Sequence, residues 1–472
     1  MIRYTTEMVF NTNIVEEFKN TSSIHGLSRF GGPELYSRRK LIWIILVLAA
    51  ASGLFIFVIL EFLHLSHNPT ITSFSTSIQE TIDFPAVTVC NLNQVKSSVL
   101  DCFSEEDKVE ASKTFYALSE LSIILEHFGL RSTNKPIPGD VLYSCARNHS
   151  HQIGDMIRYC HFKQELIDCN DIFTPIMTEL GVCYTFNKDA QMVAESVGET
   201  AGLRFFVNIQ QDLYFFSSTI QAGVKVVLHD PSEEPLPSLR GFLVGPGLSA
   251  GCSIRKTKVI TLPSPYGSCR EVSDKLSGIG TYSELTCFKH CLDDYFVQKC
   301  GCRHLFTNGK AEFCDSQQLM DCYAEYQKNI SRNSDFLHNC SCPPNCETIK
   351  YETSLSYAAF TSNFIASYLS NQSILPNEDY LSRNFIDLRL FYNSMIEEAT
   401  EEVPEKTVGS ILGTVGGQMG MFIGASILSI VEIIEFFCLL MTKGSQKVAN
   451  SKRRKLDEST DHIDETENTS KM

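Results

Sequence analysis

Residues 413–432 read GTVGGQMGMFIGASILSIVE, and this stretch decides how the rest of the chain is interpreted. Four of its glycines are spaced by four, three and four residues: Gly413, Gly417, Gly420 and Gly424. In a helix this spacing places them on one face, which then carries no side chains. Close packing against another helix in lipid is one use of such a face, and the spacing alone leaves that alternative open.

Two carboxylates follow the glycines within an apolar stretch that runs from Ile411 to Met441, namely Glu432 and Glu435. An ionisable side chain is costly in lipid unless it faces a wet cavity. A small-residue segment next to paired carboxylates suits a symmetric cation pore, because carbonyls and a hydroxyl can approach the ion while the carboxylates concentrate cations. We therefore expect a selectivity filter at Gly424, Ala425 and Ser426, and a pore and inner mouth lined by the glycine stripe, Glu432 and Glu435.

A first apolar stretch, Leu41 to Leu60, has twenty residues without a charge. At about 1.5 Å per residue a helix of this length spans roughly the 30 Å of a hydrocarbon core. Forty residues precede it and no small-residue cleavage site follows, so we expect a retained span rather than a signal peptide. The chain is therefore expected to cross the membrane twice, at 41–60 and at 411–441.

Basic residues precede the first span, at 38–40, and follow the second span, at 452–455. The positive-inside rule then predicts a cytosolic N-terminus (1–40), an extracellular domain (61–410) and a cytosolic tail (442–472). The tail is charged and lacks aromatic residues, which is typical of disorder. Four sequons are candidate glycan acceptors on the extracellular side: Asn148, Asn329, Asn339 and Asn371.

Seventeen of the eighteen cysteines lie between the two spans, and Cys438 is the exception. The clusters at 300–302 and 340–346 could hold zinc, but thiolate metal sites belong mainly to reducing compartments, so we favour disulfides and expect no metal. The formal net charge of −15 argues against nucleic-acid binding. No nucleophile–base pair stands out, so we expect neither an enzyme nor a cofactor.

Between the spans, runs rich in Val, Ile and Phe predict strands of a sheet at 84–89, 203–209, 222–228 and 385–391. Apolar residues at helical spacing predict a helix from Lys113 to Phe128, ending at Gly129.

Several motifs together resemble the degenerin, epithelial sodium channel and acid-sensing channel family, nearest in the pore segment to the acid-sensing channels. They are residues 413–432, FPAVTVCNLN at 84–93, CYTFN at 183–187, GVKVVLH at 223–229 and His25-Gly26. The resemblance runs from about residue 25 to about residue 440 and implies a membrane protein with two transmembrane helices and a disulfide-rich α+β ectodomain. It further implies a trimer, of one chain or of related subunits, whose ectodomain has finger, thumb (about 269–346), palm, knuckle and β-ball regions.

The same resemblance implies passage of Na⁺, block by amiloride-like compounds and two gating positions. His25-Gly26 would by itself be an ordinary turn, but it matches the family's gating dipeptide before the first span. Ser410 matches a position just outside the pore where a small residue permits closure. Thr407 and Thr414 stand where the acid-sensing channels carry calcium-binding carboxylates, so weak calcium block is expected.

The resemblance also implies seven disulfides. They are Cys90–Cys183, Cys160–Cys169, Cys269–Cys346, Cys287–Cys342, Cys291–Cys340, Cys300–Cys322 and Cys302–Cys314. Cys102, Cys145 and Cys252 are left over, and this odd remainder implies at least one free or intermolecular thiol.

Proton activation is the gating hypothesis that the resemblance favours. Its candidate residues are Lys225, Asp230, Glu233, Glu234, Glu398 and Glu401. Other acids of the family pattern are missing, since Ser75-Thr76 and Ala324 occupy their positions. Peptide gating and a constitutively open sodium channel therefore stay open as rivals. A two-span receptor without a pore is the alternative from a different class.

Overall fold

The computed structural model describes residues 18, 21–26, 37–118, 135–215, 220–271, 282–326, 340–426, 428–439 and 441–442. The chain forms two compact units, one from residues 1–71 and 404–472, the other from residues 72–403. We call them the membrane unit and the ectodomain unit, and each is described by itself.

The membrane unit contains the 30-residue helix α2 (Ser37–Ser66), which includes the whole of the predicted first span. Within the described residues, the part from Lys40 to Ser66 is the one unbroken helix long and apolar enough to cross a membrane. The second helix, α14 (Val408–Ile423), is followed by a helix at Leu428–Leu439 that bends away by 75°. The prediction of one continuous helix over 411–441 is therefore wrong, because the helix is broken after Ile423.

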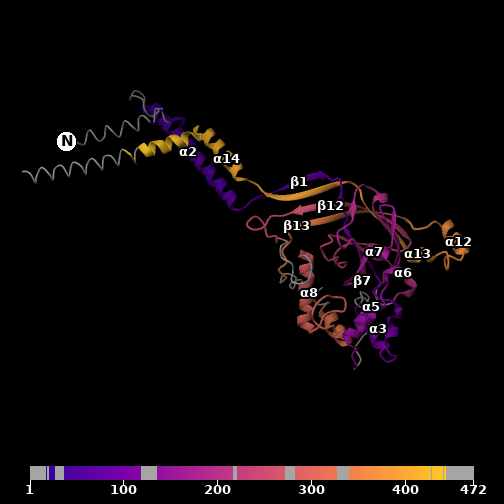
Figure 1. Cartoon of the computed structure of the whole chain (residues 1–472). Coiled ribbons are helices and arrows are strands. Elements are labelled where there is room, and N and C mark those ends of the chain that lie inside the picture. The colour runs from indigo at the N-terminus through magenta and orange to yellow at the C-terminus, as the bar shows by residue number, and fades with distance from the viewer. Residues whose placement is uncertain are drawn as a thin grey trace, which may run out of the picture. The chain divides into compact units, whose positions relative to one another are not determined.

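Helices α2 and α14 pack side by side (Figure 1). A Cβ added to Gly53 of α2 would lie 2.9 Å from the ring of Phe422, so the missing side chain permits this close approach.

The ectodomain unit is built on two main sheets rather than the single sheet that the sequence suggested. The smaller one has five antiparallel strands, in the order β11 (Phe242–Val244), β10 (Val224–His229), β3 (Ala86–Asn91), β7 (Gly181–Phe186) and β6 (Phe173–Thr178). Two predicted strands fall here, as β3 and β10. Every residue of β3 is buried, which explains why the strand lacks the apolar–polar alternation of a half-exposed strand.

The larger sheet has eight strands, in the order β1 (Thr70–Ile78), β15 (Ile396–Pro404), β12 (Leu248–Ile260), β14 (Phe385–Tyr392), β9 (Leu203–Asn208), β4 (Ile157–Phe162) and β5 (Glu165–Ile167), with β13 (Glu347–Ala359) on the free side of β12. β12 pairs in parallel with β14 and then with β15. The other two predicted strands fall here, as β9 and β14. A two-stranded ribbon joins β2 (Ile82–Asp83) to β8 (Val193–Ala194).

An aromatic core fills the space against both main sheets. Phe84 is fully buried and makes edge-to-face contacts with Phe162, Phe186 and Tyr392. Such contacts add to the free energy gained from burying the rings. This core ties strands from distant parts of the chain into one frame.

Helices cover the remaining parts of this unit. They are η3 (Ser97–Cys102), α3 (Lys108–Ala117), α5 (Gly139–Asn148), α6 (Ile153–Met156), α7 (Cys169–Ile172), η5 (Glu199–Ala201), η6 (Gln211–Leu213), α8 (Glu284–Cys300), α9 (Ser316–Gln318), η7 (Leu319–Tyr323), α12 (Asn363–Asn371) and α13 (Tyr380–Asn384). The helix predicted at 113–128 begins earlier, at Lys108, and its part beyond residue 118 lies outside the described residues. α8 begins at the N-cap Ser283, whose side chain accepts from the Thr286 amide, and ends at Gly301 with φ of 74°.

Eight disulfides join cysteines of the ectodomain unit, and they include all seven expected pairs. The eighth, Cys102–Cys145, joins η3 to α5 and accounts for two of the three left-over cysteines. Cys252 stays free and buried on β12, and Cys438 is free and exposed. Cys252 is therefore the unpaired thiol that the odd number of left-over cysteines implied.

Candidate functional site

The break after α14 falls on the segment expected to form the filter. Gly424 adopts φ of 64°, its amide donates to Gly420 O at 3.0 Å, and the Ala425 amide donates to Met419 O at 3.3 Å. This is how a glycine ends a helix, because a left-handed residue turns the chain away from the helical path. Gly424, Ala425 and Ser426 consequently lie outside any helix, whereas the sequence placed Gly424 on a continuous helical face.

The other glycines of the stripe do lie on α14. A Cβ added to Gly413 or Gly417 would meet nothing within 4 Å, and one at Gly420 would only touch Ala425 O at 4.0 Å. Close packing inside this chain therefore does not explain the stripe, since Gly53 on α2 permits the contact with α14 instead. The stripe is free to face something other than the chain's own first helix.

The short N-terminal segment at 21–26 binds to this break. The His25 amide donates to Ile423 O at 3.0 Å, and a Cβ added to Gly424 would overlap the His25 ring. Gly26 has φ of 90°, and a Cβ added there would lie 2.7 Å from a methyl of Val47. His25 thus lies against the end of α14 and Gly26 lies against α2, and a side chain larger than glycine is excluded at Gly424 and at Gly26.

A chain of hydroxyls continues from the break to the first of the expected inner-mouth carboxylates. The Ser426 amide donates to Ser429 Oγ at 2.9 Å, and Ser429 Oγ lies 2.6 Å from Ser23 Oγ. The Ser23 amide and hydroxyl donate to Glu432 Oε2 at 3.0 and 3.3 Å. Glu432 is therefore held by the N-terminal segment, whereas Glu435 is exposed.

At the other end of α14, polar side chains lock the entry of the helix. Thr407 is the N-cap, and its hydroxyl accepts from the Ser410 amide at 3.2 Å. Just before it, Glu405 lies 2.8 Å from His64 Nε2, and Lys406 pairs with Glu61. Ser410 lies in the first turn of α14 and is exposed, so a reagent in solution could reach a side chain there.

The acids expected on β15 each have a neighbour on β12 or next to it. Glu397 lies 3.2 Å from the buried Lys256, Glu398 lies 3.7 Å from Arg255, and Glu402 accepts from the Leu262 amide at 3.3 Å. Glu401 lies beside Ile260 in the register of the two strands. Because the first two carboxylates face cations, adding a proton to either one would remove an ion pair.

The acids expected after β10 behave differently from one another. Asp230 accepts from the Ser232 amide and hydroxyl, and Glu233 is buried against Arg240 at 2.5 Å. Lys225 is half-buried on β10, beside Cys90 and Leu243 in the register. The structure therefore does not gather the six candidate proton-sensing residues into one site.

Glu234 instead joins a second group of titratable residues that the sequence did not single out. It lies 3.9 Å from His290 Nε2 on α8, and Asp293, one turn further along that helix, pairs with Lys289 at 2.7 Å. Burial raises the pKa of Asp293 above its ordinary value, the nearby charge of Glu179 adds to the rise, and Lys289 opposes it. The signal available in the sequence was the Asp293-Asp294 pair within a helix bounded by cysteines.

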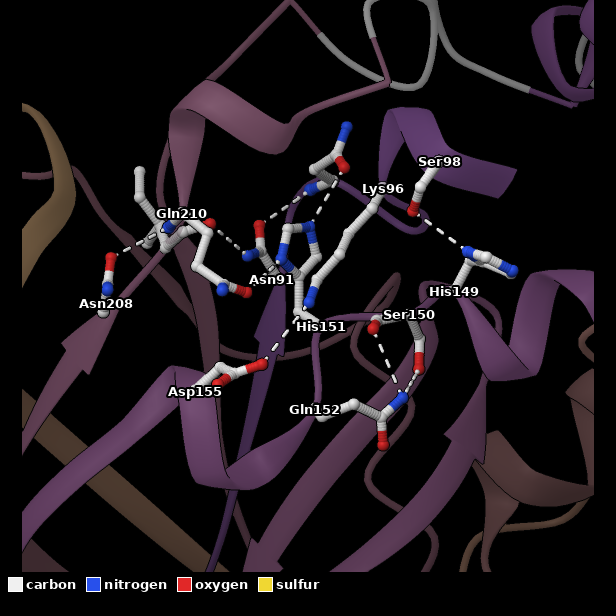
Figure 2. A network of polar contacts seen from close by, with 12 residues as sticks. Asn91, Lys96, Ser98, His149, Ser150, His151, Gln152, Asp155, Asn208 and Gln210 are labelled. Carbon is white, nitrogen blue, oxygen red and sulfur yellow. Dashed lines mark hydrogen bonds and ion pairs between the residues drawn. The ribbon is translucent and has the colours of Figure 1, made fainter. Parts of the chain in front are cut away.

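Figure 2 shows a network of polar contacts that joins the loops around β3. His151 Nδ1 lies 3.0 Å from Gln210 Oε1, and its Nε2 lies 3.1 Å from Asn93 Oδ1. Beside it, Lys96 lies 3.6 Å from Asp155. Burial lowers the pKa of His151 to about 4, so the ring stays neutral near neutral pH and joins the loops without sensing mild acid.

Comparisons with known proteins agree with this architecture. The family described as "Amiloride-sensitive sodium channel" matches residues 18–436. Acid-sensing ion channel 2 of Homo sapiens is 30% identical over 446 residues, which cover 89% of this chain and 85% of that protein. Acid-sensing ion channel 4 of Rattus norvegicus is 29% identical over 434 residues, covering 89% and 78%.

Acid-sensing ion channel 1A of Danio rerio is 27% identical over 470 residues, covering 95% of this chain and 92% of that protein. Among solved structures, a proton-activated chloride channel covers 85% of this chain at 6% identity, with a TM-score of 0.34, which is too low to indicate a shared fold. The family match spans most of the chain and includes both the ectodomain unit and α14. The chain therefore belongs to the amiloride-sensitive sodium channel family, whose members are ion channels and not enzymes.

Proposed function

We propose that the chain is one subunit of a trimeric, sodium-selective cation channel of the plasma membrane, with both termini in the cytosol. Its second span would consist of α14, the break at Gly424–Ser426 and the helix at Leu428–Leu439. The observation that carries the proposal is the meeting of His25, the break and Glu432 in one place, where a helix end and a carboxylate are held together by the N-terminal segment.

The break gives the proposed filter its chemistry. Gly424 and Ala425 lie between the two helices, so their carbonyls belong to neither helical hydrogen-bond ladder and are available to a cation. Three copies of Gly424–Ser426 around an axis would present such carbonyls, together with the Ser426 hydroxyl, to Na⁺ in the pore. Rings of Glu432 and Glu435 below them would raise the local concentration of cations.

Protons are the activator that we propose, in preference to a peptide or a constitutively open state. The relatives' names describe them as acid-sensing, and this chain has a partly buried carboxyl, Asp293, whose pKa is raised. A carboxyl with a raised pKa takes up its proton at a milder acidity than an ordinary one, so it can respond first as pH falls.

The test is whole-cell recording from cells that express this chain alone, with external pH stepped from about 8 to about 5. We expect an inward current carried by Na⁺ that appears on acidification and is blocked by amiloride. A current already present at the higher pH and indifferent to acid would contradict proton activation while leaving the channel assignment intact. No current from the chain, alone or with related subunits, would support a receptor without a pore.

A further inference from the structure

Two serine hydroxyls lie directly behind the proposed filter, and neither has been given a role in conduction above. Ser429 is in the first turn of the helix at Leu428–Leu439 and is 1% exposed. A serine in a membrane helix commonly bonds its hydroxyl to a carbonyl one turn earlier in the same helix. The Ser429 hydroxyl instead accepts from the Ser426 amide at 2.9 Å and lies 2.6 Å from the Ser23 hydroxyl. It therefore joins the filter segment to the N-terminal segment.

The contact with Ser426 fixes the start of this helix. Ser426 occupies the N-cap position, because its carbonyl accepts from the amides of Ser429 at 3.0 Å and Ile430 at 3.4 Å. In a capping box the third helical residue returns its side chain to the N-cap amide, and Ser429 does so in place of the usual Glu or Gln. The Ser426 backbone is thus held on both sides. Its hydroxyl makes no hydrogen bond to another described residue, so it stays free to face the pore.

The hydrogen bonds between these hydroxyls run in one direction. The Ser23 hydroxyl donates its single proton to Glu432 Oε2 at 3.3 Å, since a carboxylate can only accept. The contact between Ser23 and Ser429 must then be donated by Ser429. Each group consequently donates to the next, from the Ser426 amide through both hydroxyls to the carboxylate. Such a chain is strengthened by mutual polarisation of its members.

We infer that Ser23 and Ser429 are positioning residues for the proposed filter. They hold the Ser426 backbone at a fixed place relative to Glu432, while neither hydroxyl contacts the permeating ion. The inference rests on the proposed function, because it states how the filter is held and not whether the chain conducts. Removing either hydroxyl interrupts the same chain, so the loss of selectivity should be similar for both.

The test measures the reversal potential of the full-length channel under bi-ionic conditions, with Na⁺ outside and K⁺ inside. Ser23→Ala and Ser429→Ala should each lower the ratio of Na⁺ to K⁺ permeability about threefold, because each removes a hydrogen bond that fixes the filter. The double variant should lower the ratio no more than about fivefold. Independent sites would multiply to about ninefold, whereas two members of one chain do not.

Conservative variants separate positioning from general packing. Ser23→Thr and Ser429→Thr keep the hydroxyl, so they should retain the native reversal potential. The matched control is Ser22→Ala, because the Ser22 hydroxyl accepts from the Ile24 amide at 3.3 Å within its own segment. It should also retain the native potential. Ser23 is exposed, so Ser23→Ala and Ser23→Thr decide the matter even where Ser429→Ala fails to fold.

The outcomes distinguish this inference from the proposed function. A native reversal potential in both alanine variants, with an altered one in Ser426→Val, would reject the positioning role and leave the filter in place. Smaller currents at the native potential would show a packing role only and overturn the inference, as would a ninefold loss in the double variant. A native chain without current, alone or with related subunits, would reject the proposed function and this inference with it.

Discussion

In the membrane unit, the residues that we propose to conduct ions are held by backbone geometry, whereas in the ectodomain unit the proposed proton-binding residues are held by side-chain charges. Gly424 ends α14 through a left-handed turn with no space for a side chain. Asp293 lies beside Lys289 in a partly buried group that a proton can alter without moving the chain. Substitutions in the first region should therefore abolish function, and substitutions in the second should tune it.

The largest effect should come from Gly424→Ala. The added Cβ overlaps the His25 ring, and the left-handed conformation costs a non-glycine residue about 1–2 kcal/mol. We expect complete loss of current with normal surface expression, measured by whole-cell recording and surface biotinylation.

Two variants sharpen that prediction. Gly416→Ala is the matched control, because Gly416 is not one of the stripe glycines, its Cβ meets nothing within 4 Å and the variant should conduct normally. Adding His25→Ala to Gly424→Ala relieves the overlap and should restore part of the current. Full current in Gly424→Ala alone would show that the break is not part of the ion pathway.

The next effect concerns the outer end of α14. Attaching a bulky charged group to Ser410→Cys with a membrane-impermeant thiol reagent should hold the channel open and raise the steady current about tenfold, because the small side chain permits closure. The native protein should not respond. Cys252 is buried and burial raises the pKa of its thiol to about 12, and the exposed Cys438 lies in the helix at Leu428–Leu439, on the proposed cytosolic side that an impermeant reagent does not reach. An unaltered current after complete modification of Ser410→Cys would reject the gating assignment.

A smaller effect is expected from external calcium. Thr407 and Thr414 offer hydroxyls in place of carboxylates, and Glu405 is engaged with His64 at 2.8 Å, so block should be weak. Thr414→Asp should lower the half-blocking calcium concentration about fivefold at fixed pH, because three copies add carboxylate ligands. The isosteric Thr414→Asn is the control. Strong block in the native channel that neither variant alters would place the calcium site elsewhere.

The smallest effect should come from the ectodomain. Because burial raises the pKa of Asp293, this carboxyl takes up a proton at milder acidity than an ordinary one, and the stabilisation of the protonated state is present at low pH and lost as pH rises through the raised pKa. Asp293→Asn fixes this side chain in a neutral form that resembles the protonated carboxyl, so half-activation should need about 0.3 pH units less acid. Asp294→Asn, at the exposed neighbouring position, should not shift the curve. Equal shifts in both variants would show that Asp293 has no specific role in proton sensing.

Much of the fold could be predicted from local patterns. The uninterrupted apolar run at 41–60 and the runs that became β3, β9, β10 and β14 carry their signal within a few residues. Their division between two sheets depends on pairings between distant segments, such as β12 with β14, which no local pattern contains. The Cys102–Cys145 bond was also out of reach, because a count of cysteines does not say which pairs lie close together.

The candidate sites, too, could be predicted from the sequence only in part. The glycine spacing identified Gly424, but a helical period predicts a straight helix, and the break depends on the left-handed turn and the docked N-terminal segment. Glu398 drew attention through the family resemblance, yet in the structure it lies beside Arg255, as its neighbour Glu397 lies beside Lys256. Asp293 was passed over because its pKa depends on burial, which follows from the packing of α8 and not from its neighbours in sequence.

The most direct test of the central claim is the reversal potential of the current under bi-ionic conditions, with Na⁺ outside and K⁺ inside, in the native channel and in Ser426→Val. If Gly424–Ser426 forms the filter, the native current reverses at a positive potential, and Ser426→Val either carries no current or reverses near zero because the hydroxyl is gone and the bulk has increased. A Ser426→Val current that reverses at the native potential would contradict the account.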